Sequence, residues 1–292
     1  MKKLNQYLVF PLSLAATIVG ATWLMSFVHA SMVPLTITVV AFVGVLALER
    51  VMPRVARPSE QKELRTDLTF VGLTALLSDP LANALVVALV IGLSSIIPAG
   101  LAASMWLPAA TASVLVAGGF GDYWAHRLAH ETGWWWKLHA VHHAPHRMVA
   151  LNNLRLHPVD LILKTLFTSA PVLALGFSPE AIALAASVRG LNVAFQHADI
   201  DLRHGPLNLL FSTNSVHRWH HSAERSEADA NYGGVLSIFD LLFGTFRVPS
   251  EEEEPGAMGL YDEQHYPIHK VARSLVAPLC WKRCVTADPA QD

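Results

Sequence analysis

Two long apolar stretches follow one another at the N-terminus of the chain, over residues 7–28 and 32–48. A helix needs roughly 20 apolar residues to cross the hydrocarbon core of a bilayer, and the first stretch is long enough. A cleaved signal peptide is the alternative, because this stretch follows a basic start and ends at Val28-His29-Ala30. Its length favours a span, so the two stretches predict a transmembrane hairpin.

Composition and charge agree with an integral membrane protein. Only 15% of the residues are charged, whereas roughly 25% are charged in an ordinary soluble domain, and the mean hydropathy is +0.37. The net charge of −2 gives no global basic field that would attract nucleic acid. Basic residues lie on one side of the hairpin, which the positive-inside rule makes cytoplasmic: Lys2, Lys3, Arg50, Arg54, Arg57, Lys62 and Arg65.

Further apolar stretches extend the membrane region. Residues 68–98 are too long for one span and contain Asp79-Pro80, so we expect an interfacial segment followed by a span over residues 81–97. A fourth span is predicted over residues 102–123, and a shorter apolar hairpin over residues 161–196. The predicted fold is an all-α polytopic membrane bundle of about four spans plus this hairpin. We divide the chain into membrane helices (1–100), a histidine-rich region (101–248) and a polar tail (249–292).

Histidine is concentrated in one part of the chain: twelve of the fifteen histidines fall between residues 126 and 221. The first cluster spaces two of them at i, i+4, and the next two clusters repeat an i, i+3, i+4 triplet. On a helix these spacings gather the rings on one side. Counting spans places all three clusters on the cytoplasmic side, as a helical cap. The clusters are His126 and His130; His139, His142 and His143; and His217, His220 and His221.

Eight imidazoles are too many for one metal ion and suit two adjacent ions that keep open positions. Nitrogen ligands favour iron, zinc or copper over magnesium or calcium. Either triplet alone could be a surface cluster, but the repeat favours a metal site. The isolated histidines His29, His204, His265 and His269 are interpreted as ordinary surface or core residues.

The clusters "HRLAH", "HAVHH" and "HRWHH", together with "LRLHP", "FQHAD" and "NYGGVLSIFDLLFGTFR", resemble the fatty acid hydroxylase and sterol desaturase superfamily over residues 118–248. The resemblance makes 101–248 a catalytic region and the eight histidines ligands of a di-iron centre. It adds His197 as a ninth ligand, and His157 as either a ligand or a hydrogen-bond partner of one. His146 lies outside the pattern and is expected at the surface or in a substrate channel.

The resemblance implies a membrane-bound oxidoreductase that uses dioxygen to hydroxylate or desaturate a lipid. Its cofactors would be two iron ions, for which zinc can substitute in a purified form. We see no haem motif or nucleotide-binding loop, so electrons would come from a ferredoxin, a b-type cytochrome or a reduced pterin. A membrane zinc hydrolase is an alternative, although the chain lacks "HExxH". A non-catalytic haem- or metal-binding membrane protein is another.

Several residues near the clusters are weaker candidates. A carboxylate can orient a ligating imidazole through its other nitrogen, and Asp122, Glu131 and Glu224 lie within a turn of a predicted ligand. Asn231 either shapes the site or forms a turn. A plain surface role is the alternative for each carboxylate.

Other features of the region receive a structural interpretation. The run of tryptophans at 134–136 is interpreted as an interfacial anchor, and residues 251–254 as a solvated acidic turn. Cys280 and Cys284 imply no disulfide framework and are interpreted as ordinary residues.

Overall fold

The computed structural model of the chain describes residues 2–55, 61–93, 100, 102–250, 253–261 and 265–285. Among these residues all regular structure is helical, and the only β-type pairings are isolated bridges. The predicted all-α class is therefore confirmed. Arg57, the expected turn at Pro98, Glu251 and Glu252 lie outside the described residues.

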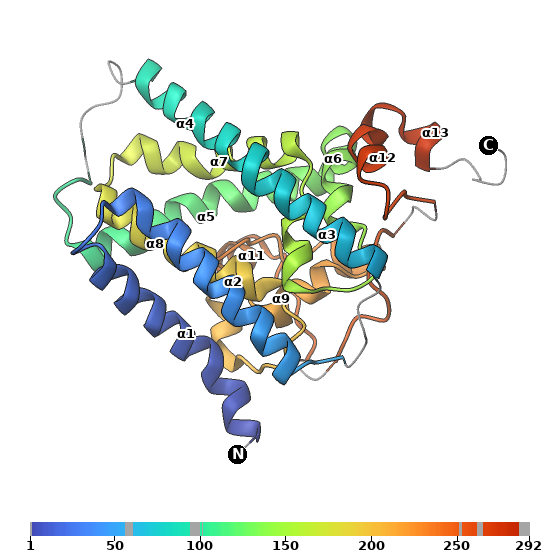
Figure 1. Cartoon of the computed structure of the whole chain (residues 1–292), viewed down its shortest axis with the longest axis horizontal. Helices are drawn as coiled ribbons and strands as arrows, with labels where there is room; N and C mark the ends of the chain where they lie inside the picture. The colour runs from blue at the N-terminus through green and yellow to red at the C-terminus, as the bar shows by residue number, and fades with distance from the viewer. Residues whose placement is uncertain are drawn as a thin grey trace.

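The helices run as a membrane part followed by a cap and a tail (Figure 1). The longer α-helices are α1 (Lys2–Leu24), α2 (Val33–Val51), α3 (Gln61–Leu73), α4 (Asp79–Leu93), α5 (Leu107–Glu131), α6 (Gly133–His143), α7 (Pro158–Leu175) and α8 (Pro179–Gln196). Shorter α-helices are α9 (Asn214–His220), α10 (Arg225–Ala228), α11 (Ile238–Phe243), α12 (Val271–Val276) and α13 (Trp281–Val285). Short helical turns are η1 (Ala30–Met32), η2 (Thr74–Ser78), η3 (Ala150–Leu154), η4 (Gly205–Leu209) and η5 (Ala277–Leu279).

Four helical stretches are long and apolar enough to cross a membrane: Leu4–Leu24, Ala30–Val51, Gln61–Gly92 and Pro158–Leu175. At most 17% of the residues in the apolar window of each are buried, so their side chains are available to contact lipid. The chain is an integral membrane protein. The expected number of spans agrees, but the set differs from the prediction. Helix α7 qualifies, whereas α5, expected as the fourth span, is lined with buried residues and does not.

We expected Asp79-Pro80 to interrupt the third apolar region, but it does not. Helices α3 and α4 form one long rod (Figure 1), joined by the π-helical turn η2, in which the Asp79 N–H donates to the Thr74 carbonyl. A π turn widens the helix and is a common site of local adjustment. Pro80 lies directly after η2, in the first turn of α4. Its missing N–H therefore does not break the rod.

Helix α5 packs against both α7 and α8, and the three helices position the functional region. A Cβ atom at Gly121 of α5 would lie 2.0 Å from the Phe167 carbonyl oxygen of α7. Glycine therefore permits the two helix backbones to approach closely, as small residues do in membrane bundles. Helix α7 ends at Gly176, whose φ of 64° suits a left-handed C-cap. Ser178 then caps α8 by accepting from the Ala181 N–H.

The tail packs against the cap: α12 and η5 contact α6, and Figure 1 shows α12 beside α6. Cys280 and Cys284 form a disulfide, so the interpretation of both as ordinary residues was wrong. The local chain is folded into helical turns, and the i, i+4 spacing places the two Cα atoms 5.5 Å apart, which is within bonding geometry.

Candidate metal centre

Nine histidines converge at the end of the bundle from four helices. The last turns of α5 carry His126 and His130, α6 carries the second cluster, His197 ends α8, and α9 carries the third cluster with His221 at its C-cap. Every one of the nine is buried, with between 0 and 4% of its surface exposed. Buried polar side chains need partners, so this concentration requires a compensating ligand or hydrogen bonds.

The nine imidazoles divide into two groups that could each hold a metal ion. Within each group, the potential ligand atoms lie within 4.8 Å of one another. The first group has five members: His126, His130, His139, His143 and His220. The second has four: His142, His197, His217 and His221. The groups are adjacent, because the rings of His143 and His221 stack with centroids 4.2 Å apart.

Each triplet is divided between the two groups. In α6, the i, i+4 pair His139 and His143 belongs to the first group, whereas His142 belongs to the second. In the third cluster, the i, i+4 pair His217 and His221 belongs to the second group, and His220 to the first. The two triplets are thus used in reciprocal fashion. We predicted two adjacent ions from the number of histidines, but the allocation of each ligand follows from how the helices cross.

The Nε2 atoms face inward at short separations. The Nε2 of His126 lies 3.0 Å from that of His139 and 2.9 Å from that of His220. In the second group, the Nε2 of His217 lies 3.1 Å from His197 and 3.0 Å from His221. Two nitrogens about 2.1 Å from one ion, and at right angles around it, are about 3 Å apart. These spacings therefore fit nitrogens that share a coordination sphere.

Backbone carbonyls hold two of the outward Nδ1 atoms. The Nδ1 of His126 lies 2.8 Å from the Tyr232 carbonyl oxygen, and that of His220 lies 2.7 Å from the Ala230 carbonyl oxygen. A carbonyl can only accept, so each Nδ1 carries the proton and the Nε2 lone pair points into the group. Such outer hydrogen bonds fix the tautomer of a metal-ligating histidine.

Side chains hold two more imidazoles in the same way, and a carboxylate approaches a third. The His139 Nδ1 lies 2.9 Å from Asp160 Oδ2, and the His197 Nδ1 lies 2.9 Å from Asn152 Oδ1. Asp229 Oδ1 lies 3.5 Å from the His130 Nδ1.

Electrostatics keep these imidazoles neutral. Burial, reinforced by neighbouring histidines, lowers the pKa of His143, His217 and His221 well below the usual 6.5. A neutral imidazole is the form that binds a metal. The number of donors, their inward lone pairs and their protonation state thus all fit two transition-metal ions bound by nitrogen.

Residues 111–245 match the family model described as fatty acid hydroxylase. All nine converging histidines fall within this match. Nearly half of the chain is thus similar to this family, and residues 111–245 are called the hydroxylase domain below.

Relatives of the hydroxylase domain are lipid enzymes by name. An ornithine lipid hydroxylase of Rhizobium tropici is 41% identical over 46% of this chain and 41% of its own length. The human (Homo sapiens) alkylglycerol monooxygenase is 36% identical over 46% of this chain and 29% of its own length. A Delta(7)-sterol-C5(6)-desaturase of Nicotiana tabacum is 31% identical over 46% of this chain and 48% of its own length.

The chain spans less than half the length of each of these relatives. No solved structure is significantly similar to the chain.

His157, predicted as a ligand or a partner of one, lies outside both groups of the hydroxylase domain. Its Nδ1 accepts from the Val159 N–H and caps α7. Its Nε2 lies 3.0 Å from the Leu275 carbonyl oxygen in the tail and donates to it. The residue therefore joins the start of α7 to α12. Among the other histidines, His146 is exposed, as expected, and the buried His204 contacts Asn214.

The four weaker candidates are not hydrogen-bonded to the histidines of the domain. Asp122 is buried and pairs with Arg189, while Glu131 is half exposed and pairs with Arg127. Glu224 is exposed at the start of α10. Asn231 has a φ of 55°, and its side chain bonds the backbone of Val216 and Arg247. It therefore forms a turn, and the residues on either side of it supply the carbonyls that contact His220 and His126.

The residues that do hold imidazoles were missed because they are distant in sequence. Asp160 stands 21 residues after His139, and Asn152 stands 45 residues before His197. Nothing in the sequence singled out Asp160, because an acidic residue in the first turn of a helix is common. Asp160 also accepts from Trp135 Nε1 at 2.8 Å.

The tryptophan run was only partly interpreted correctly. Trp134 is exposed, as an anchor would be, but Trp135 and Trp136 are buried. Trp136 packs beside His130 and His143, so it forms part of the wall of the centre.

Proposed function

We propose that the chain is a membrane-bound oxygenase that uses two iron ions and dioxygen to hydroxylate or desaturate a lipid. The observation that carries the proposal is the pair of adjacent groups of five and four imidazoles with inward lone pairs. The names of the relatives support a lipid substrate and an oxidative reaction. The proposal places the catalytic region at residues 101–248, between membrane helices at 1–100 and a tail at 249–292.

The protein's own contribution is to hold the two ions, orient the imidazole rings and shield the site from water. Nine buried imidazoles provide the donors, and acceptors such as Asp160 fix the ring orientations. Burial keeps water from the imidazoles, and the apolar helices can deliver a lipid from the bilayer. Iron bound there would supply the activation of dioxygen, which side chains cannot perform. Reducing equivalents would come from a ferredoxin, a b-type cytochrome or a reduced pterin.

A zinc hydrolase is less well supported by the geometry. It needs a carboxylate that can act as a general base on metal-bound water. The nearest carboxylates, Asp160 and Asp229, lie on the outer Nδ1 side of the rings rather than on the Nε2 side. Their placement suits orientation of the ligands.

The test combines metal analysis with lipid profiling. We expect about two irons per purified chain, and products shifted by +16 or −2 mass units in the lipids of cells that express it. His142→Ala should lower the metal content and abolish the product, because it removes one of four donors from the second group. His157→Ala is the matched control and should keep its iron. Full activity of His142→Ala, or zinc alone at full occupancy with no lipid product, would refute the proposal.

A further inference from the structure

A pocket of about 730 Å³ lies beside the histidine groups. Three parts of the chain form most of its wall: the loop after α6 at residues 146–149, the tail segment at 254–261, and Arg218 of α9. Val55, four residues beyond the end of α2, also contributes. Because α2 is a candidate span, this edge of the pocket is close in sequence to the membrane surface.

The pocket adjoins the metal centre through several of its lining residues. Arg218 directly follows His217, and His146 is three residues after His143. The Gly259 N–H donates to the His221 carbonyl oxygen at 3.3 Å. The Tyr261 ring stacks on Trp136 with centroids 4.8 Å apart, and Trp136 packs on the first group. A ligand in this pocket would therefore lie next to the candidate site of reaction.

One end of the pocket carries buried charge. Arg218 is only 3% exposed, and it forms ion pairs with Glu254 at 3.4 Å and with Asp199 at 3.8 Å. Among the described residues, its Nε and Nη2 atoms are buried without a hydrogen-bond acceptor. Leaving guanidinium donors unsatisfied is unfavourable. Glu254 is exposed, as expected of a solvated acidic turn, and it also pairs with Arg54.

The charges at this end have both signs. A simple anion would be attracted to Arg218 but repelled by the carboxylates of Glu254 and Asp199. A simple cation would be attracted to the carboxylates but repelled by Arg218. A headgroup with an anionic and a cationic part can satisfy both sets, because oxyanions pair well with guanidinium and ammonium with carboxylate.

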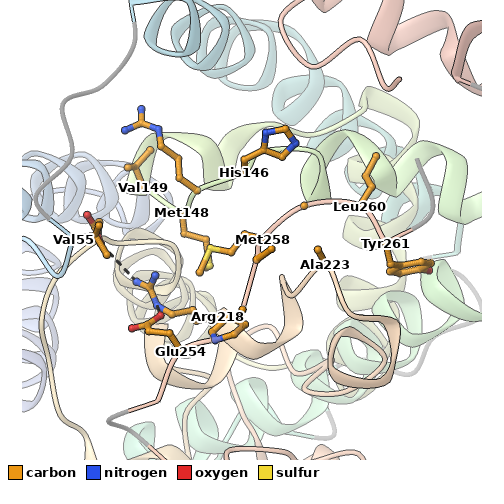
Figure 2. A pocket seen from close by; sticks show the side chains of 16 residues that line it. Val55, His146, Met148, Val149, Arg218, Ala223, Glu254, Met258, Leu260 and Tyr261 are labelled. Carbon is orange, nitrogen blue, oxygen red and sulfur yellow. Dashed lines mark ion pairs between the residues drawn. The ribbon is translucent and has the colours of Figure 1, made fainter. Parts of the chain in front are cut away.

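Apart from His146 and Arg147, the residues that line the rest of the pocket are apolar residues, glycines and Tyr261. Figure 2 shows Arg218 and Glu254 near one end, Leu260 and Tyr261 at the other, and Met148 and Met258 between them. Methionine adapts to irregular apolar ligands. The pocket is thus amphiphilic along its length.

We propose that this pocket binds the zwitterionic headgroup region of an amphiphile. The anionic group pairs with Arg218, the cationic group pairs with Glu254 and Asp199, and the adjoining apolar part lies over Met148 and Met258. The inference deepens the proposed function, on which it rests, by naming the charge class of the substrate headgroup. Amino-acid lipids and phosphatidylethanolamines share this chemistry.

The test measures binding of short, soluble amphiphiles to the metal-loaded full chain in a neutral maltoside detergent. The zwitterionic probes are N-octanoyl-lysine and dihexanoyl phosphatidylethanolamine. The comparison probes are octanoate, octylamine and monooctanoylglycerol. We expect at least one zwitterionic probe to bind roughly ten-fold or more tightly than all three others, since a buried charge pair discriminates strongly. The probe that binds identifies the source of the headgroup.

Variants locate the binding. Arg218→Gln should remove the preference for zwitterions, whereas Arg273→Gln, at an exposed arginine of α12, should keep it. Because Arg218→Gln removes the ion-pair partner of the Asp199 carboxylate and can unfold the cap, Met258→Trp provides a second test. It fills the pocket from the tail and should weaken binding of the zwitterionic probe roughly ten-fold.

Equal binding of all five probes, a preference for a singly charged or neutral probe, or unchanged selectivity in a folded Arg218→Gln variant would overturn the inference. So would unchanged binding in Met258→Trp. These readouts need no turnover. If the pocket does not bind zwitterions, iron content and lipid products would be unaffected. If the proposed function is wrong, those two measurements would show it.

Discussion

At the scale of single residues, four of the candidate ligands, His126, His139, His197 and His220, have a contact at each ring nitrogen. The inward Nε2 contacts involve histidines whose spacing is visible in the sequence. The outward Nδ1 contacts involve groups that come from other parts of the fold, such as Asp160, Asn152 and the Ala230 carbonyl. Proximity in sequence pointed instead to Asp122 and Glu131, which pair with arginines.

Asp160→Asn tests the importance of the outward contacts. The Asp160 carboxylate contacts the His139 Nδ1, Trp135 Nε1 and Lys164 Nζ, the last at 4.0 Å. Replacing it with a neutral amide weakens its hold on the imidazole, so we expect metal affinity to fall roughly 10–100-fold. Chelator competition followed by metal analysis measures this. Glu131→Gln, at a half-exposed carboxylate, is the control. Equal metal retention in the two variants would contradict the role of Asp160.

At the scale of elements, helical spacing is informative but incomplete. It correctly indicates that i, i+4 histidines share a group, as His126 with His130, His139 with His143 and His217 with His221. It does not predict that His142 and His220 belong to the group opposite their neighbours. That allocation follows from the angles at which α5, α6 and α9 meet, which no local pattern encodes.

Gly121→Ala tests the close packing of α5 on α7. A Cβ atom there would clash with the backbone of Phe167, so the helices must separate. We expect a loss of about 1–3 kcal/mol in stability, as for overpacked cores, together with weaker metal retention because α5 carries His126 and His130. Thermal unfolding in detergent measures the change. Gly72→Ala has open space around its Cβ and should leave stability unchanged or raise it by up to about 1 kcal/mol. Identical melting temperatures for the two variants would refute the packing argument.

At the scale of the whole molecule, the spans and the cap together place a polar site at the end of an apolar bundle. The sequence predicted this arrangement, and the four candidate spans agree in number. The sequence did not predict that α3 and α4 form one continuous rod, or that α7 rather than α5 is apolar enough to cross a membrane. The sequence did not predict the structure of the tail, which packs on the cap and closes one wall of the pocket.

The orientation of the cap is a prediction that cysteine labelling can test. In a chain with Cys280 and Cys284 replaced by serine, a single cysteine is introduced at Ser26, between α1 and α2, or at Ser226 in α10. Both positions are exposed. The positive-inside rule predicts that a membrane-impermeant maleimide labels Ser26→Cys on intact cells. Ser226→Cys should react only after permeabilisation. Labelling of Ser226→Cys on intact cells would reverse the assignment.

The sequence by itself determined the membrane class, the helical fold and eight of the nine histidines, because apolar length and helical spacing are local properties that survive in any context. The ninth, His197, came from the family resemblance. Only the tertiary structure decided how the histidines divide into groups of five and four, which acceptors hold their Nδ1 atoms, and where His157 belongs. It also brought Arg218 together with Glu254 and the loop after α6 to form a pocket. These features depend on contacts between segments far apart in the chain, which burial and helix packing create.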